Sequence, residues 1–138
     1  MATTTSEFTV DTRGENSTVN ITEMVSDIVS KSGTENGIAH IFVRSTTSSV
    51  LICEDEEGLL RDIVEAGKRF APDNLDYRHN EAWHDDNGRS HVKASFLGQS
   101  LSVPIVESSL SLGTWQSIFL IEFDVRPRKR SIVVSIFE

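Results

Sequence analysis

The chain has 138 residues, 38% of them hydrophobic and 25% charged, which is the composition of one ordinary globular domain over 1–138 and too short for two independent cores. Thirteen lysines and arginines against 21 aspartates and glutamates give a net charge of −8, which repels nucleic acid and anionic membrane surfaces. The longest apolar runs fall well short of the roughly 20 residues of a membrane-spanning helix, so neither nucleic acid nor membrane is expected as a partner.

The amino terminus and the cysteine content predict a cytoplasmic protein. Residues 1–6 are polar and lack the basic-then-apolar order of a secretory signal. The single cysteine, Cys53, can form no internal disulfide and no cysteine-rich zinc site. This agrees with a reducing compartment.

The first 33 residues predict a strand followed by an amphipathic helix. Apolar and polar residues alternate over 5–12, which is typical of a half-buried strand. Apolar residues then recur at helical intervals over 21–32. Asn20 stands at the N-cap position of this helix and Gly33 at its left-handed exit.

The middle of the chain predicts a strand pair and a second helix. The apolar or β-branched runs 38–44 and 49–54 are joined by a hydroxyl-rich connection, so they are expected to pair. An acidic start and an apolar stripe predict a helix over 56–70, ended by Pro72. Glu54 is the leading carboxylate candidate, because it follows an apolar strand.

The rest of the chain predicts a long loop and more antiparallel sheet. Residues 73–89 are polar and turn-rich, and irregular stretches of this length are often functional. A short helix over 90–97 and a strand over 101–106 follow. Residues 115–125 and 131–137 have the pattern of a hairpin around an arginine-rich turn. Helices packed against antiparallel sheet give an α+β fold.

Three of the four histidines, His79, His84 and His91, fall within thirteen residues. Neutral imidazoles are strong zinc ligands, and three protein ligands with one open position are the plan of a catalytic metal site, although this spacing fits no fixed zinc motif. His79 and His91 are alternatively a general acid and base that need no metal. A third interpretation is a hydrated loop in which His84 is exposed and His91 caps or packs against a short helix.

Two further segments are candidates for binding an anion. Thr46 and Thr47 offer hydroxyl and backbone donors at the end of a strand, but such residues are equally typical of the wet face of a strand. Arg126, Arg128 and Arg130 alternate, so an extended chain places all three on one face, where they can hold a phosphate. A solvated turn or a set of subunit salt bridges is the alternative.

A series of motifs along nearly the whole chain resembles the YjbQ-like family. Leu-Gly-Thr-Trp-Gln followed by an Arg-Pro-Arg turn is specific in combination. In chain order the motifs are Thr46-Thr47-Ser48-Ser49 running to Glu54, Tyr77-x-His79, Asn87-x-x-x-His91, Gly98-x-Ser100-x-x-x-Pro104, Leu112-Gly113-Thr114-Trp115-Gln116 and Arg126-Pro127-Arg128.

The resemblance implies an antiparallel β-sandwich with helices packed outside, and a threefold homotrimer. Family members are often labelled secondary thiamine-phosphate synthases, which join a pyrimidine diphosphate to a thiazole phosphate. Dedicated enzymes of that kind are (β/α)₈ barrels of at least about 200 residues, so this chain would use an unrelated scaffold. Many members carry a histidine directly before the Thr-Thr pair, where this chain has Ser45. A three-histidine metal site then needs His84 or Glu54 to complete it.

These features predict an enzyme acting on a small phosphorylated molecule, with thiamine-phosphate synthase-like transfer as the reaction that the resemblance implies. The candidate residues are His79, His91, Glu54 and Asn87 as catalytic groups, Thr46, Thr47, Arg126 and Arg128 as phosphate-binding groups, and His79, His91 and His84 as ligands of a zinc or magnesium ion. The alternative, from a different class, is a homotrimeric protein that binds an anion or a metal without turnover.

Overall fold

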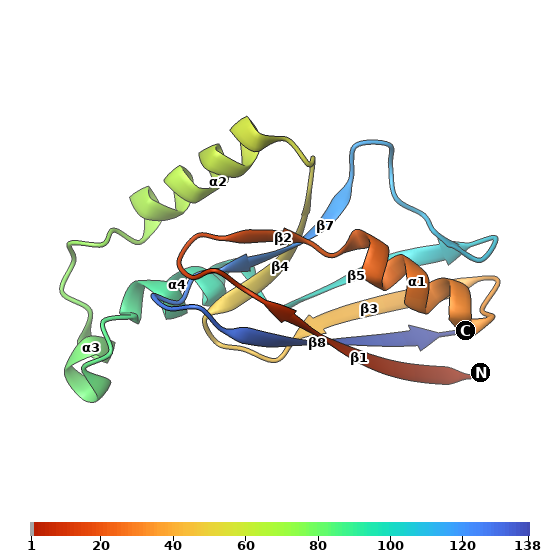
Figure 1. Cartoon of the computed structure of the whole chain (residues 1–138), viewed down its shortest axis with the longest axis horizontal. Helices are drawn as coiled ribbons and strands as arrows, with labels where there is room; N and C mark the ends of the chain where they lie inside the picture. Colours follow the sequence, from red (N-terminus) through yellow and green to blue (C-terminus); the bar gives the residue numbers. More distant parts are fainter. Residues whose placement is uncertain (1) are drawn as a thin grey trace.

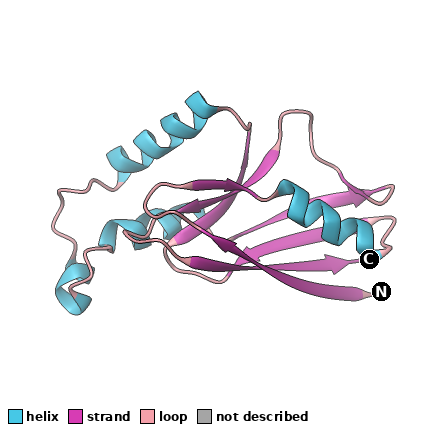
Figure 2. Ribbon diagram, in the orientation of Figure 1, coloured by secondary structure: helices cyan, strands magenta, loops and turns pink. Residues whose placement is uncertain are grey.

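Two antiparallel sheets and four helices make up residues 2–138, the part of the chain that the computed structural model describes (Figure 1, Figure 2). The strands are β1 (Thr3–Asp11), β2 (Thr18–Asn20), β3 (Gly37–Val43), β4 (Ser48–Cys53), β5 (Ser100–Val106), β6 (Ser109–Leu110), β7 (Ser117–Glu122) and β8 (Lys129–Phe137). The helices are α1 (Thr22–Ser32), α2 (Glu57–Phe70), α3 (Arg78–Trp83) and α4 (Gly88–Leu97). The larger sheet has the order β1-β8-β3-β5-β6 and the smaller one β2-β7-β4. The predicted combination of helices with antiparallel sheet is confirmed.

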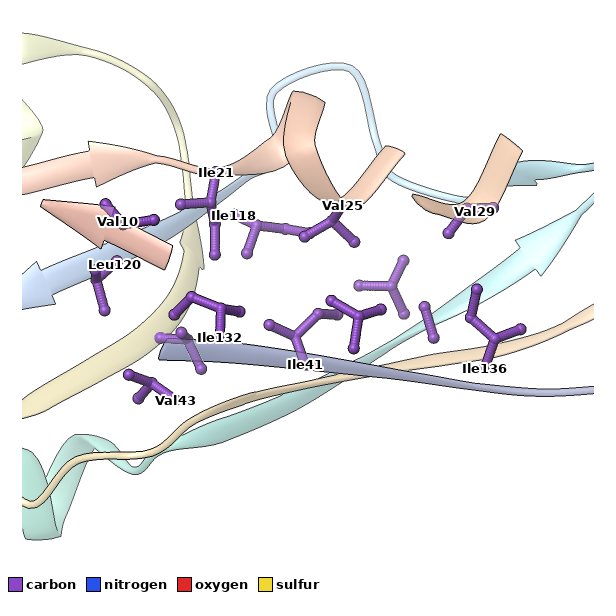
Figure 3. Packing of buried hydrophobic residues seen from close by; sticks show 14 of the residues in the cluster. Val10, Ile21, Val25, Val29, Ile41, Val43, Ile118, Leu120, Ile132 and Ile136 are labelled. Atoms are coloured by element: carbon purple, nitrogen blue, oxygen red, sulfur yellow. The ribbon is translucent and has the colours of Figure 1, made fainter. Parts of the chain in front are cut away.

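The main apolar core lies between the two sheets and α1 (Figure 3). Helix α1 presents Val25 and Val29, which lie one turn apart on the same face, and both are buried. Ile132 of β8 comes from the larger sheet, and Ile118 and Leu120 of β7 come from the smaller one. Residues from all three layers therefore share one core.

Helix α1 has the ends that its sequence predicts. The side-chain oxygen of Asn20 accepts hydrogen bonds from the Thr22 backbone N–H at 3.0 Å and from the Thr22 hydroxyl at 2.6 Å. Gly33 ends the helix with a φ of 76°, a left-handed conformation that glycine adopts without a steric penalty. The helix predicted over 21–32 is confirmed.

Helix α2 begins as predicted but is packed differently from α1. The Glu56 carboxylate accepts from the backbone N–H groups of Gly58 and Leu59, so it caps the helix. No residue of α2 is buried, and Figure 1 shows the helix standing beside the sheets, whereas α1 lies across them. No helix within residues 2–138 has the length and apolar character needed to cross a membrane.

Two strand pairings expected from the sequence are wrong. Residues 115–125 and 131–137 form no hairpin, because β7 pairs with β2 and β4 whereas β8 pairs with β1 and β3. Strands β3 and β4 likewise belong to different sheets. Hydrophobic alternation locates strands, but their pairing is decided by which faces pack against one another, and both connections here cross from one sheet to the other.

The polar stretch 73–89 contains a helix that the sequence did not indicate. Helix α3 buries no residue, so no apolar period marks it. It ends at His84, whose φ of 56° is left-handed, and Asp86 repeats this conformation with a φ of 53°. The chain therefore turns sharply between α3 and α4, which places the two helices side by side.

Candidate functional site

Helices α3 and α4 touch at Gly88, the first residue of α4. A Cβ atom on Gly88 would clash with Cβ of Tyr77, so only glycine fits this close approach. The Gly88 backbone N–H donates to the side-chain oxygen of Asn80 at 2.8 Å. The Tyr77 hydroxyl donates to the Pro72 carbonyl oxygen at 2.7 Å. These contacts fix α3 against the start of α4.

This contact brings the rings of His79 and His91 together. The ring centroids lie 4.2 Å apart, and the ring planes are tilted by 53°. Both side chains are half-buried, so the pair is open to solvent on one side. One substrate molecule can therefore meet both imidazoles, although their chemical role stays a prediction.

The surroundings of His91 favour its neutral form. Burial lowers the pKa of His91, and a charge on the adjacent His79 lowers it further. The carboxylates of Asp85 and Asp124 oppose this shift without overcoming it. A neutral imidazole at neutral pH is the form that accepts a proton or binds a metal.

A buried carboxylate, Asp124, is only 1% exposed, and its charge acts on His91 and raises the pKa of that imidazole. One of its oxygens accepts from the Asn87 amide at 3.4 Å and from the Val125 backbone N–H at 2.8 Å. The other accepts from the Thr47 hydroxyl at 3.3 Å and from Nε of Arg128 at 2.8 Å. Burial alone would raise the pKa of Asp124, but these hydrogen bonds outweigh it and lower the pKa, so the group is ionised at neutral pH.

Asp124 and Arg128 form one ion pair, and Glu122 and Arg130 form a second, buried one that is linked to it. Arg130 donates to the fully buried Glu122, from Nε at 2.8 Å and from Nη2 at 2.5 Å. The same Nη2 donates to the Thr47 hydroxyl at 2.7 Å, and the Thr12 hydroxyl donates to Glu122 at 2.8 Å. The hydroxyl of Thr47 therefore joins the Arg130 pair to Asp124, which holds the carboxylate in a fixed orientation.

Five of the predicted site residues meet in this region. His79 and His91 form the pair, while Asn87, Thr47 and Arg128 all contact Asp124. Thr47 uses its hydroxyl within the network, so it is a positioning residue. Arg128 is different, because its side chain is 36% exposed and only two of its three guanidinium nitrogens, Nε and Nη2, contact Asp124. Its Nη1 remains as a donor for a ligand.

Within residues 2–138 the other four predicted residues form no hydrogen bond, ion pair or ring contact with the pair or with Asp124. Thr46 and Arg126 are exposed, and within residues 2–138 their side chains form no hydrogen bond or ion pair. His84 is exposed at the end of α3. Glu54 follows the far end of β4, roughly 20 Å along the strand from Thr47 at about 3.3 Å per residue. Glu54 is therefore not part of this site, because β4 carries it away from the histidines.

The sequence analysis missed Asp124 and Glu122 as members of the site, and it gave Arg130 to a phosphate, whereas the structure pairs Arg130 with Glu122. A signal for the two acids was present, since both interrupt the apolar run 118–125 and acidic residues are seldom buried unless they are paired. Arginines at 128 and 130 are the natural partners for them. Reading the acids and the arginines together would have predicted the two ion pairs.

The donor set around the pair falls short of a complete metal site. His79 and His91 supply two imidazole nitrogens, and an open zinc site takes three protein ligands. Within residues 2–138 no three histidine, cysteine, aspartate or glutamate side chains are grouped closely enough to hold a metal ion. Both oxygens of Asp124 already accept hydrogen bonds. A metal completed by His84 stays a prediction.

Fold and site together define a small mixed α/β protein with curled antiparallel sheets and a histidine pair beside a buried carboxylate. Solved structures share this fold over nearly the whole chain. A YbjQ-like protein of unknown function from Sulfolobus solfataricus superposes with a TM-score of 0.88 at 36% identity, covering 98% of each chain. An uncharacterised protein of the YjbQ/UPF0047 family from Clostridium acetobutylicum gives a TM-score of 0.86 at 34% identity, covering 96% of this chain and 99% of that one.

The sequence comparisons identify the family. A family model described as UPF0047 protein YjbQ-like matches residues 6–138. A UPF0047 protein from Methanothermobacter thermautotrophicus is 44% identical over 118 residues, which cover 86% of this chain and 80% of the relative. One from Archaeoglobus fulgidus is 36% identical, covering 93% of this chain and 97% of the relative. The chain therefore belongs to the YjbQ-like UPF0047 family, whose function is uncharacterised, and the resemblance seen in its sequence is confirmed.

Proposed function

We propose that the chain is an enzyme that acts on a small phosphorylated molecule and uses the histidine pair to move a proton. The observation that carries this proposal is the contact between the rings of His79 and His91 beside the buried, ionised Asp124. A pair of imidazoles held this closely shares one proton readily and takes a second one reluctantly. Such a pair suits a step in which one ring accepts a proton and the other donates one.

In this mechanism His91 is the general base, because its surroundings favour the neutral form. His79, in α3, faces the same substrate and donates a proton to the leaving group. Asn87 and Asp124 are positioning residues, since they fix the start of α4 and contribute negative charge close to the pair.

Arg128 is the proposed phosphate contact. Its guanidinium is oriented by Asp124 and still offers Nη1 at the surface. A charge-assisted hydrogen bond from a pre-oriented arginine gives geometric selectivity for a phosphate oxygen. Arg126, two positions before Arg128, and Thr46, next to Thr47, are exposed and are secondary candidates for the phosphate contact.

In the reaction implied by the family label, the ring nitrogen of a thiazole phosphate forms the new C–N bond and the C–O bond to pyrophosphate breaks. It needs a phosphate contact and a proton from His79 for the departing pyrophosphate. The attacking nitrogen carries no proton, so in this reaction His91 orients His79 and is a general base only for substrates whose nucleophile carries a proton.

The alternative is a protein that binds an anion or a divalent zinc or magnesium ion without turnover. The test is a turnover assay on metal-analysed pure protein, with a pyrimidine diphosphate and a thiazole phosphate as substrates, beside calorimetric titration of pyrophosphate. Turnover that disappears in His91→Asn while pyrophosphate binding remains supports the enzyme. Binding without turnover in the wild type supports the alternative, and a wild type that binds no substrate, no pyrophosphate and no metal overturns both.

We also propose that three copies assemble into a homotrimer in the cytoplasm, each copy being a sandwich of its two sheets. The outer face of the larger sheet supports this proposal, because it exposes Ile38, Phe42 and Phe137 at 41–49%. Ile38 and Phe137 are register partners on neighbouring strands, so their side chains lie together. Contiguous exposed apolar residues of this kind are typical of a contact surface. Light scattering that returns a monomer at micromolar concentration would overturn the trimer.

A further inference from the structure

A second concave region lies between α2 and α4, apart from the histidine pair. It is a cavity of about 330 Å³, lined by Ile63, Phe70, Phe96, Leu97, Phe123 and Lys93. This volume is at the lower end of the range for sites that hold small organic molecules. Its walls are aliphatic and aromatic except for one side chain, that of Lys93.

The amine of Lys93 has no partner. The residue is only 1% exposed, and its Nζ is buried without a hydrogen bond within residues 2–138. The nearest recorded contact of the amine is the Phe123 ring, whose centroid lies 5.8 Å away. Burying an ammonium group without a partner is costly, and burial lowers the pKa of Lys93. Such a group gains from any ligand that brings a negative charge into the cavity.

The carboxylates closest to Lys93 are already engaged by Arg89, one turn earlier in α4. Glu15 accepts from Nε and Nη2 of Arg89 at 2.7 and 2.9 Å, and an oxygen of Asp73 lies 3.2 Å from the same Nε. Lys68 adds a further positive charge in the neighbourhood. The charges of Glu15 and Asp73 raise the pKa of Lys93, but within residues 2–138 no carboxylate forms an ion pair or hydrogen bond with its amine.

A ligand can enter the cavity between α2 and α4. Phe70 of α2 and Phe96 of α4 meet edge to face with ring centroids 4.6 Å apart, and they are 53% and 74% exposed. No residue of α2 is buried, so this helix can shift at low cost. The flexible stem of Lys93 forms part of the wall next to Gly67, so a rotation of that stem turns the amine toward a ligand.

We propose that this cavity binds a monocarboxylate with an apolar body, the carboxylate pairing with Lys93 and the body filling the space between Phe70, Phe96 and Phe123. A carboxylate fits better than a phosphate, because the cavity offers one amine and no arginine among its lining residues. The apolar body follows from the apolar walls. This site is independent of the proposed enzyme activity, since neither histidine lines the cavity and Lys93 and His91, two residues apart in α4, lie about 200° apart around the helix axis.

The test compares octanoate with octan-1-ol, which share the apolar chain and differ in charge, by calorimetric titration of the full chain. We expect the wild type to bind octanoate roughly tenfold to a hundredfold more tightly than octan-1-ol, and Lys93→Met to lose that preference. Gly67→Leu places a side chain in the cavity and improves the helix propensity of α2, so it should abolish octanoate binding in a folded protein.

The outcomes decide the proposal even if one variant fails to fold. Equal binding of octanoate and octan-1-ol by the wild type, or no binding of either, would overturn it. Retention of octanoate binding in folded Gly67→Leu would also overturn it, because the ligand would then lie elsewhere. Thermal melts establish folding, and unchanged pyrophosphate binding in Gly67→Leu separates this cavity from the histidine site.

Discussion

The two sides of the molecule are stabilised in different ways. On the sheet side, aliphatic residues of α1, β3, β7 and β8 interlock, and Ile41, Ile118 and Val134 are completely buried. On the helix side, α2 and α3 bury no residue, and polar contacts around Asp124 and Arg89 hold the segments in place. Most of the buried apolar surface therefore lies on the sheet side, whereas the histidine pair and the Lys93 cavity lie beside helices that bury no residue of their own, α3 and α2.

The largest expected effect is on the sheet side. Ile41→Ala removes a buried side chain from the shared core and should lower the free energy of unfolding by about 2–5 kcal/mol. Leu60→Ala on α2, where the side chain is only half-buried, is the matched control and should cost clearly less. Urea denaturation measures both variants. Equal losses would show that α2 is packed as firmly as the core.

On the helix side, Arg128→Ala should cause the largest loss of ligand binding. Loss of one charge-assisted hydrogen bond of roughly 1.5–3 kcal/mol weakens pyrophosphate binding about tenfold to a hundredfold. Arg126→Ala, with the same change of charge two positions away, was expected from the sequence to behave alike, but its exposed side chain should give a smaller loss. Calorimetric titration decides between them, with thermal melts as the folding control. Equal affinities of both variants and the wild type would return the arginines to a purely structural role.

Gly88→Ala should separate the histidines with a smaller loss of stability, about 1–3 kcal/mol for an overpacked contact. The added methyl group clashes with Tyr77 and displaces α3, so His79 moves away from His91. Nuclear magnetic resonance titration of both imidazoles is the measurement. Gly67→Ala, which is also in a helix and brings the added carbon no closer than 3.7 Å to another side chain, is the matched control without a clash. Unchanged coupling between the two rings in Gly88→Ala would contradict this account of the site.

The smallest expected effect is a pH dependence of stability from His91. Its pKa is lowered in the folded protein, so the unfolded chain takes up this proton at a higher pH than the folded chain. The stabilising contribution of neutral His91 is therefore fully present above the ordinary histidine pKa of about 6.5. It is lost as the pH drops from that value through the lowered pKa of the folded protein. His91→Asn should flatten the dependence, and His84→Asn, at an exposed position, should not. Thermal melts of the wild type and both variants, at roughly one-unit steps from about pH 8 to about pH 5, would show the difference in stability.

Much of the local structure could be predicted from the sequence. The cap of α1 and its left-handed exit at Gly33 depend on residues within a few positions of each other, and the helix was placed correctly. Helix α3 could not be predicted in the same way, because it buries nothing and is held by the contact of Tyr77 and Asn80 with Gly88. Glu54 was an attractive candidate by sequence position alone, but the length of β4 takes it out of the site.

The residue pattern was enough to predict the family, the α+β class and the limits of α1 and α2. The pairing of the strands, the contact of His79 with His91, and the ion pairs of Arg128 with Asp124 and Arg130 with Glu122 became visible in the folded molecule. The physical reason is range. Caps, turns and periodicity depend on neighbours along the chain, whereas a buried ion pair or a ring contact depends on how two sheets and their crossings pack in space.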